Sequence, residues 1–394
     1  MSEVAQVPQL RFPEFSGEWE EKRFDSLYPT VRNGFVGVAT PYYVEEGVPY
    51  LQGKNIKSGA INRNGLVYIN ESFHQKSKKS QLRQNDIVMV QSGHVGECAV
   101  ITEEFEDTNC HALLVSTPTH DIDSKFYINY FYSKFGRKKI YRITTGNTIK
   151  HILSSDLKIQ TVSNPSYQEQ QKIAAFLTAV DTKIEQLSKK QELLGEYKKG
   201  LMQQIFSQAI RFKADDGSDF PDWEEKRLGG CILENQKSQI QVNFVSDNTE
   251  RDDVNIYPFF TSGNKALFTD SPIVEGDNIF LSTGGIATIN FYSGKGSYST
   301  DVFCISSVSE NTRFIYYYLL SILIKIDRKL FYGSGLKHLD KKAFRKIITT
   351  LPALPEQTKI ANFLSSVDSK IEQVGKQLDE SKQFKKALLQ RMFV

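Results

Sequence analysis

The sequence Pro165-Ser166-Tyr167-Gln168-Glu169-Gln170-Gln171-Lys172-Ile173-Ala174-Ala175-Phe176-Leu177 decides the architecture, because a close copy of it begins 187 residues later at Pro352. Between 165–187 and 352–374 the chain has 14 identities in 23 positions without a gap. Unrelated sequences of average composition match at roughly one position in fifteen. The chain therefore contains an internal repeat, and this repeat determines how its other parts are interpreted.

Each copy predicts a long helix that begins just after its proline, where the missing backbone N–H does no harm. Apolar residues follow at alternating steps of three and four, which is typical of a coiled-coil seam. About 40 helical residues make a rod of roughly 60 Å. We expect two such helices in one chain to pair as an antiparallel coiled coil with approximate two-fold symmetry; two separate surface helices are the alternative. The seam residues are Ile173, Leu177, Val180, Ile184, Ile360, Leu364, Val367 and Ile371.

The heptad pattern is interrupted at Gln191 and Lys198 in the first helix and at Ser381 and Lys385 in the second. Gly195 and Gly375 lie inside the helices at non-equivalent places. Each glycine costs about 1 kcal/mol relative to alanine, and the sequence offers no explanation for them.

A second repeated signature marks the start of each half: Trp19-Glu20-Glu21-Lys22-Arg23 recurs from Trp223. The predicted fold is α+β, with two tandem modules of mixed α/β structure separated by the two long helices. The expected divisions are an N-terminal segment (1–19), a first module (20–164), a first helical spacer (165–210), a linker (211–223), a second module (224–351) and a second helical spacer (352–394).

The two modules share a plan. Each has strand-rich segments that end in polar glycine loops (48–55 and 86–94; 257–265 and 277–285), then an aromatic helix (126–135; 314–323) and a closing glycine loop (145–152; 332–339). The helices and closing loops repeat well, whereas the strand-rich parts differ. This contrast favours two recognition modules on one scaffold, although drift in unimportant loops would also produce it.

The totals indicate a globular protein without a membrane segment. Of the 394 residues, 40% are hydrophobic and 24% charged, and the net charge is +3 at pH 7. The first residues lack a basic stretch followed by an apolar one, so we expect no secretory signal and a cytoplasmic location. Cys98, Cys110, Cys231 and Cys304 have no metal-ligand or disulfide spacing, and we expect buried free thiols.

Two motifs suggest catalysis but do not survive comparison between the repeats. Asn164-Pro165-Ser166-Tyr167 approximates the adenine-gripping motif of DNA amino-methyltransferases, and Phe331-Tyr332-Gly333-Ser334-Gly335 approximates an S-adenosylmethionine loop. The equivalent positions in the other half lack the amide, the aromatic residue or a glycine. The histidines show no metal-ligand spacing. We expect no catalytic site and no bound metal.

Basic residues flank the glycine loops and form three groups, at 76–83, 134–142 and 337–346. Such groups are often only solvated faces. Here they adjoin loops that carry Gln, Ser, Asn, Lys and His, which are the side chains that contact phosphates and base edges. This combination is suited to binding a polyanion.

The duplicated Pro-x3-Glu-Gln-x-Lys-Ile-Ala-x-Phe-Leu-x2-Val-Asp-x-Lys-Ile-Glu-Gln, from Pro165 and Pro352, resembles the DNA-specificity subunits of type I restriction–modification enzymes. The duplicated Trp-Glu-Glu-Lys-Arg supports this, and the resemblance covers essentially the whole chain. It implies that each module recognises one half of a bipartite double-stranded DNA target. It also implies that two methyltransferase subunits, which use S-adenosylmethionine to methylate adenine, and two restriction subunits, which use ATP and Mg²⁺, bind a chain that has no cofactor or catalytic activity itself.

From loop position and side-chain chemistry we expect DNA contacts from both modules. The alternatives are an adenine N6-methyltransferase, which would itself bind S-adenosylmethionine, and a coiled-coil scaffold that binds no DNA. The expected contacts are Lys54, Asn55, Gln91, Ser92, His94, Lys138, Asn147, Lys150, Asn264, Lys265, Thr283, Ser334, Lys337 and His338.

Overall fold

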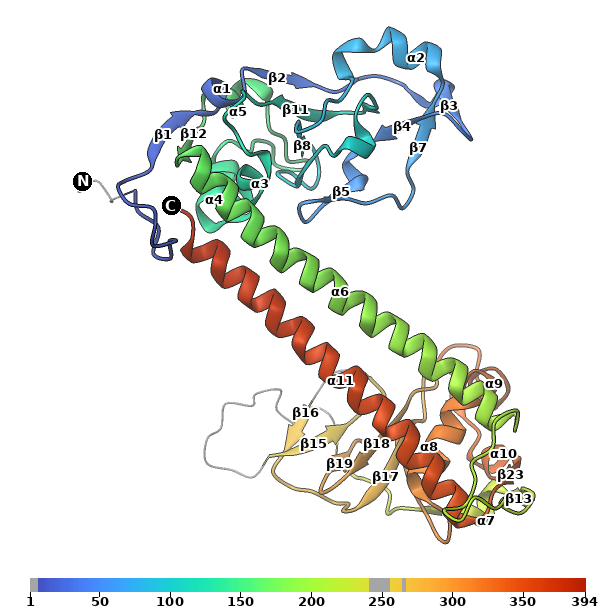
Figure 1. The fold of residues 1–394 in the computed structure, drawn as a ribbon. Coiled ribbons are helices and arrows are strands. Elements are labelled where there is room, and N and C mark those ends of the chain that lie inside the picture. Colours follow the sequence, from blue (N-terminus) through green and yellow to red (C-terminus); the bar gives the residue numbers. More distant parts are fainter. Residues whose placement is uncertain (1–5, 241–255, 264–266) are drawn as a thin grey trace. The chain divides into compact units, whose positions relative to one another are not determined.

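The computed structural model describes residues 6–240, 256–263 and 267–394 (Figure 1). The chain divides into two compact units: unit 1 is Met1–Ser188 with Lys376–Val394, and unit 2 is Lys189–Gly375. Both divisions fall inside the long helices. Each unit therefore contains one module together with parts of both helices, rather than a module alone.

The predicted long helices are present as α6 (Tyr167–Phe206, green in Figure 1) and α11 (Leu354–Arg391, red). A buried glutamine stabilises the start of each helix. Gln170 Nε2 donates to the Pro165 carbonyl at 3.0 Å, and Gln357 Nε2 donates to the Pro352 carbonyl at 2.9 Å. The repeat keeps this glutamine because its side chain, in the first helical turn, hydrogen-bonds the proline carbonyl just ahead of the helix.

The glutamate that precedes each glutamine is also buried and forms an ion pair. Glu169 accepts from Arg11 at 2.7 Å, and Glu356 accepts from Arg211 at 2.8 Å. A carboxylate near a helix N-terminus is favoured by the helix dipole. The Glu-Gln repeat therefore joins each helix start to an arginine, Arg11 or Arg211, in the segment that precedes each module.

In unit 1 the beginning of α6 packs against the end of α11. Ile173 and Leu177 share one apolar core with Leu388 and Met392. Asp181 pairs with Lys385 at 2.6 Å. The two helices are therefore antiparallel in this unit.

Unit 2 repeats the arrangement with the helices exchanged. Ile360 and Leu364 at the start of α11 share a core with Ile205 near the end of α6. Lys198 pairs with Asp368 at 2.6 Å. Lys198 and Lys385, which interrupt the heptads, are equivalent positions of the repeat, and each meets the equivalent aspartate of the other helix.

The other predicted seam residues are less enclosed. Val367 is buried, while Val180, Ile184 and Ile371 are half-buried. In unit 2 a Cβ at Gly375 would lie 2.8 Å from Gln191 Nε2, so the glycine leaves room for that side chain. Nothing lies within 4 Å of a Cβ placed at Gly195.

The Trp-Glu-Glu-Lys-Arg signature, which marks the start of each half, forms an edge strand in each unit. β1 (Glu20–Arg23) pairs antiparallel with β12 (Thr161–Asn164), and β13 (Glu224–Arg227) with β23 (Ile348–Leu351). The second strand of each pair leads directly into a long helix. The signature therefore ties the start of each module to its end.

Unit 1 contains two four-stranded sheets and several short helices. One sheet has the order β2-β11-β8-β9 and is antiparallel, the other has the order β10-β4-β7-β3, and β5 pairs with β6. The strands are β2 (Thr30–Asn33), β3 (Tyr43–Val44), β4 (Val48–Leu51), β5 (Ile56–Lys57), β6 (Ala60–Ile61), β7 (Val67–Ile69), β8 (Ile87–Val90), β9 (Cys98–Val100), β10 (Asn109–Cys110) and β11 (Leu113–Thr117). The helices are α1 (Phe24–Leu27), α2 (Glu71–Lys76), α3 (Ser124–Tyr132), α4 (Lys134–Arg142) and α5 (Ser154–Ile159), with 3₁₀ turns at Thr40–Tyr42, Gly53–Asn55, Lys78–Ser80 and Glu103–Phe105.

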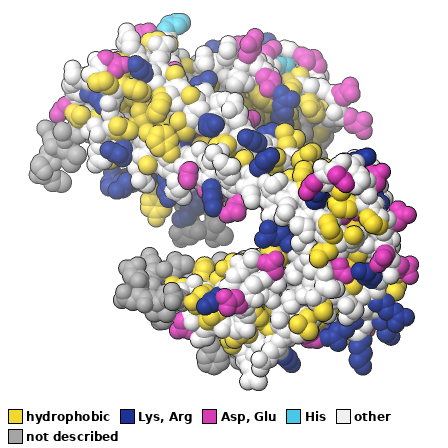
Figure 2. Space-filling model, turned by 60° about the horizontal axis from the view of Figure 1, so that its bottom comes forward, with side chains coloured by type: hydrophobic (Ala, Val, Ile, Leu, Met, Phe, Trp, Pro, Cys, Tyr) yellow, Lys and Arg dark blue, Asp and Glu magenta, His cyan; other side chains and the backbone are white. Residues whose placement is uncertain are grey.

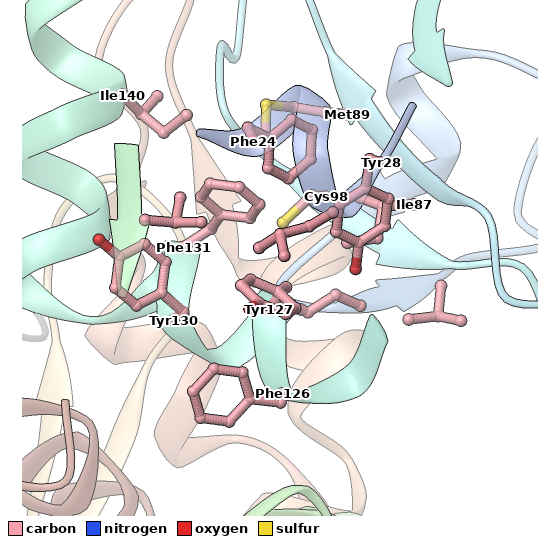
Figure 3. Packing of buried hydrophobic residues seen from close by; sticks show 14 of the residues in the cluster. Phe24, Tyr28, Ile87, Met89, Cys98, Phe126, Tyr127, Tyr130, Phe131 and Ile140 are labelled. Carbon is pink, nitrogen blue, oxygen red and sulfur yellow. The ribbon is translucent and has the colours of Figure 1, made fainter. Parts of the chain in front are cut away.

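The main core of unit 1 is aromatic (Figure 3). Phe24 stacks on Tyr28 with ring centroids 4.5 Å apart and meets Phe131 edge-on at 5.7 Å. The next-to-last residue of the chain, Phe393, enters the same core and packs against Phe126 at 5.3 Å. The end of the second helical repeat thus completes the first unit.

The described residues of unit 2 follow the same plan. Its main sheet has the order β14-β20-β17-β18, beside a sheet β16-β15-β19 and the hairpin β21-β22. The strands are β14 (Ile232–Glu234), β15 (Tyr257–Phe260), β16 (Leu267–Thr269), β17 (Asp277–Ser282), β18 (Ile289–Ser293), β19 (Ser297–Tyr298), β20 (Val302–Ser307), β21 (Phe331–Tyr332) and β22 (His338–Leu339). The helices are α7 (Leu228–Cys231), α8 (Thr312–Ser321), α9 (Leu323–Leu330) and α10 (Lys341–Arg345).

The predicted aromatic helices 126–135 and 314–323 are each divided, which corrects the sequence interpretation. In unit 1 α3 ends and α4 begins around Ser133, whose hydroxyl accepts from the Gly136 N–H at 3.1 Å. A Cβ at Gly136 would lie 2.1 Å from the Tyr130 carbonyl, so the turn needs glycine there. A capping serine within an aromatic run is the signal that periodicity alone overlooks.

The four cysteines are buried and unpaired, as predicted. Burial raises the pKa of Cys98 to about 12, so its thiol is neutral at physiological pH. Among the described residues, none of the helices has both the length and the apolar character needed to span a membrane.

Candidate nucleic-acid interface

In unit 1 the loop after β8 is hydrogen-bonded to the closing glycine loop. The Ile152 N–H donates to the Gln91 carbonyl at 2.9 Å, and the Gly93 N–H donates to the Lys150 carbonyl at 3.3 Å. We call this contact the loop junction. It fixes two polar loops, far apart in sequence, at the same end of the main sheet.

Unit 2 has the same junction between the loop after β17 and the β21-β22 hairpin. The Leu339 N–H donates to the Thr283 carbonyl at 3.0 Å, and the Gly285 N–H donates to the Lys337 carbonyl at 2.9 Å. The closing-loop residues are those of unit 1 shifted by 187. The repeat therefore preserves a three-dimensional contact between loops as well as the helices.

The closing loops need glycine at one equivalent position. Gly146 has φ +94°, and a Cβ there would lie 2.1 Å from the Ile149 carbonyl. Gly333 has φ +148°, and its Cβ would lie 2.5 Å from the Leu336 carbonyl. Both contacts are too short for any side chain, so the tight turn that presents the following lysine depends on glycine.

The junction of unit 1 borders a hollow of about 1120 Å³. Exposed polar side chains from several segments line it, and Arg137 and Tyr141 of α4 join them. We call it the recognition hollow. Five residues predicted as DNA contacts line this hollow: Lys54, Ser92, His94, Lys138 and Lys150.

Three predicted contacts of unit 1 lie elsewhere. Gln91 is half-buried beside Ser92, and Asn147 is exposed in the closing loop, outside the hollow. Asn55 is fully buried: its amide donates to the Asn62 carbonyl at 2.9 Å, and its oxygen accepts from the Gln52 N–H at 3.0 Å. Asn55 therefore shapes the loop and is removed from the expected contacts.

In unit 2 the closing hairpin carries three predicted contacts at its surface: Ser334, Lys337 and His338 are all exposed. Thr283 is half-buried, and its hydroxyl donates to the Asp301 carbonyl at 2.8 Å, which reduces its availability. Asn264 and Lys265 lie outside the described residues.

Exposed apolar residues beside the junctions were missed from sequence. Ile149 is 57% exposed and its repeat equivalent Leu336 is 64% exposed. Tyr141, which lines the recognition hollow, is 77% exposed. Apolar and aromatic groups contact thymine methyls and sugars in DNA complexes. The signal was an apolar residue directly before the lysine in both closing loops.

Some side chains of the basic groups form ion pairs with carboxylates of the same unit. Lys139 pairs with Glu21 at 2.7 Å and Lys341 with Glu234 at 2.8 Å. On the face shown in Figure 2, Lys and Arg side chains occur in several separate groups with Asp and Glu between them. On this face the basic side chains therefore do not form one continuous patch.

The motifs that suggested catalysis have structural roles. Asn164 Oδ1 accepts from the Tyr127 hydroxyl at 2.6 Å and from Gln170 Nε2 at 3.2 Å, which fixes the strand before α6. Gly333 lies at the tight turn of the closing hairpin. The described residues contain no group of His, Cys, Asp and Glu side chains placed to hold a metal ion.

The family model described as "Type I restriction modification DNA specificity domain" matches residues 16–194 and again residues 221–380. Two proteins of Methanocaldococcus jannaschii are similar along their length. One, named as the MjaX specificity subunit, is 25% identical, with 98% of this chain and 94% of that protein covered. The type I restriction enzyme MjaVIII specificity subunit is 24% identical, with 96% and 92% covered.

Among solved structures, the type I restriction-modification S subunit from M. genitalium has the same fold, with a TM-score of 0.68 at 18% identity over 98% of this chain and 99% of that one. Because the family model covers most of the chain in two copies, this protein belongs to the type I restriction–modification DNA specificity family, whose role is recognition of the DNA target.

Proposed function

We propose that this chain recognises a bipartite DNA duplex, with the loop junction of each unit contacting one half of the target. The observation that supports this most directly is the repeated junction. The same backbone hydrogen bonds recur in both units. The closing loops keep a Lys-His pair, whereas the loops after β8 and β17 carry different side chains. A repeated backbone framework that carries different contact side chains is what recognition of two different half-sites requires.

We further propose that the chain acts without catalysis of its own. Methyltransferase subunits would supply S-adenosylmethionine and methylate adenine, and restriction subunits would supply ATP- and Mg²⁺-dependent cleavage. The structural roles of Asn164 and Gly333 support this division of work. The stoichiometry of two of each partner is part of the proposal.

The target itself can be determined by sequencing modified adenines in a host that carries this chain with its methyltransferase. We expect one motif with two specified halves and an unspecified spacer. A single undivided motif would contradict the bipartite part of the proposal, and no modification at all would contradict the whole.

The contribution of the junctions can be tested with Lys150→Ala and Lys337→Ala in the methyltransferase complex. Each should weaken binding of the target duplex and reduce the salt slope by about one. Lys125→Ala is the control, because Lys125 is exposed and lies away from the junction. Its neighbour Ser124, the first residue of α3, donates to the Asn85 carbonyl just before the start of β8, whereas the junction follows the end of β8. If both junction variants behave like this control, the junctions do not contact DNA.

A further inference from the structure

We infer that unit 1 holds the DNA backbone beyond the half-site, on lysines of α4 and α11 that adjoin the recognition hollow. This inference rests on the proposed function and specifies where the duplex continues. The residues concerned are Lys134, Lys382 and Lys386, which we call the helix-side lysines.

The helix-side lysines line a second hollow of about 660 Å³ within unit 1. Its walls come from the α3–α4 turn, from α6 and from the last turns of α11. This hollow adjoins the recognition hollow, because Ser58, Glu97 and Arg137 line both. A DNA strand that leaves the recognition hollow across these three residues therefore reaches the second hollow.

The shared wall is held together by several hydrogen bonds to Glu97. Glu97 accepts from the Ser58 N–H at 2.7 Å, from the Tyr132 hydroxyl at 2.9 Å and from Arg137 Nη2 at 2.9 Å. Arg137 also lies 4.3 Å above the Tyr132 ring. Burial raises the pKa of Glu97, but these hydrogen bonds and the charge of Arg137 outweigh burial, so its pKa is lowered overall.

The second hollow is strongly basic. Its lining holds five cationic side chains and two carboxylates, a net charge of +3. Glu97 pairs with Arg137 at 2.9 Å and Asp181 with Lys385 at 2.6 Å, which accounts for both carboxylates. Within the described part of the chain, the helix-side lysines have no ion-pair partner. Glu185 and Asp379 lie on the same helices but outside the lining.

The chemistry of these groups fits phosphates rather than bases. Lysine is a flexible point charge without the fixed geometry that distinguishes base edges. Lys382 and Lys386 are one turn apart on α11, about 6 Å along its axis. That spacing covers about two phosphates of one strand, at roughly 3.4 Å of duplex axis each. The predicted contact is therefore independent of sequence.

The basic lining of the second hollow is only partly repeated in the sequence of unit 2. At the equivalent positions of the repeat, Lys134 is replaced by Ser321, Arg137 by Ile324 and Lys382 by Gly195, whereas Lys386 is kept as Lys199. The ion pairs that hold the helices together are kept in both copies, so these lysines are not needed for helix pairing. The presence of Lys134 and Lys382 in one copy only indicates a one-sided contact with the spacer DNA.

The test uses the complex of the full chain with its methyltransferase, carrying K134Q, K382Q and K386Q together. Affinity for the target duplex is measured from low to high salt. Each lost phosphate contact reduces the slope of log affinity against log salt by about 0.9, so the triple variant should lose roughly two to three units of slope. Preference among target sequences should not change. The matched control, K190Q with K199Q and K370Q, removes the same charge from exposed helix positions of unit 2 and should leave the slope unchanged.

Three results would overturn the inference. The triple variant could keep the wild-type slope, or it could lose slope only as much as the control does. It could also assemble poorly with the methyltransferase in the absence of DNA while its slope stays normal, which would assign the hollow to an acidic protein surface instead. Failure of the proposed function is distinguishable, because the wild-type complex would then not bind its target duplex at all.

Discussion

Replacing Phe393 by alanine should destabilise unit 1, although this residue lies at the end of the chain in the second helical repeat. Its side chain is only 1% exposed. The ring lies 5.3 Å from Phe126, 6.2 Å from Tyr130 and 6.3 Å from Trp19, measured between centroids. Removing a buried phenylalanine ring costs about 3–5 kcal/mol of unfolding free energy.

For a unit of this size, 1 kcal/mol shifts the unfolding midpoint by about 2–4 °C. The expected decrease for Phe393→Ala is therefore roughly 6–20 °C. The chain has two tryptophans, Trp19 in unit 1 and Trp223 in unit 2. In a Trp223→Phe background, fluorescence reports unit 1 alone, from a residue that contacts the mutated site.

Phe384→Ala is the matched control, because Phe384 lies on the same helix but is 52% exposed. It should change the Trp19 transition by less than about 2 °C, since surface substitutions usually stay within 0.5 kcal/mol. If Phe393→Ala and Phe384→Ala gave the same midpoint, the chain end would not belong to the core of unit 1.

Further predictions concern the helices and the wall of the hollows. Gly195→Ala should raise the unfolding free energy of unit 2 by about 1 kcal/mol in urea unfolding, since the new Cβ meets open space. Gly375→Ala should raise it less, because the new Cβ displaces Gln191. Equal increases for the two variants would contradict that packing. The lowered pKa of Glu97 means that its carboxylate contributes stability above its ordinary value of 4.5, which is lost as the pH falls through the folded value. Glu97→Gln should therefore be about 1–3 kcal/mol less stable at pH 7, and the difference from wild type should close toward pH 3; a constant difference across this range would exclude the charged form as its source. Deleting one heptad from both long helices removes about 10 Å of helix length, which corresponds to about three base pairs of duplex. Sequencing of modified adenines should then show a shorter spacer with unchanged half-sites. An unchanged spacer would refute the role of the helices in spacing.

The sequence by itself determined the parts that depend on local pattern or on identity between the repeats. The seven-residue periodicity predicted α6 and α11, and the copied signatures marked the starts of the two modules, where β1 and β13 lie. These inferences held because a helix or strand is encoded by residues close together in the chain.

Only the tertiary structure decided which distant side chains meet. It buried Asn55, which loop position and side-chain chemistry had placed among the contact residues. It also showed that the lysines interrupting the heptads pair with Asp181 and Asp368. It also placed Phe393 in the core of the first unit. A recognition hollow built from several separate segments depends on contacts between residues far apart in sequence, and local periodicity carries no information about such contacts.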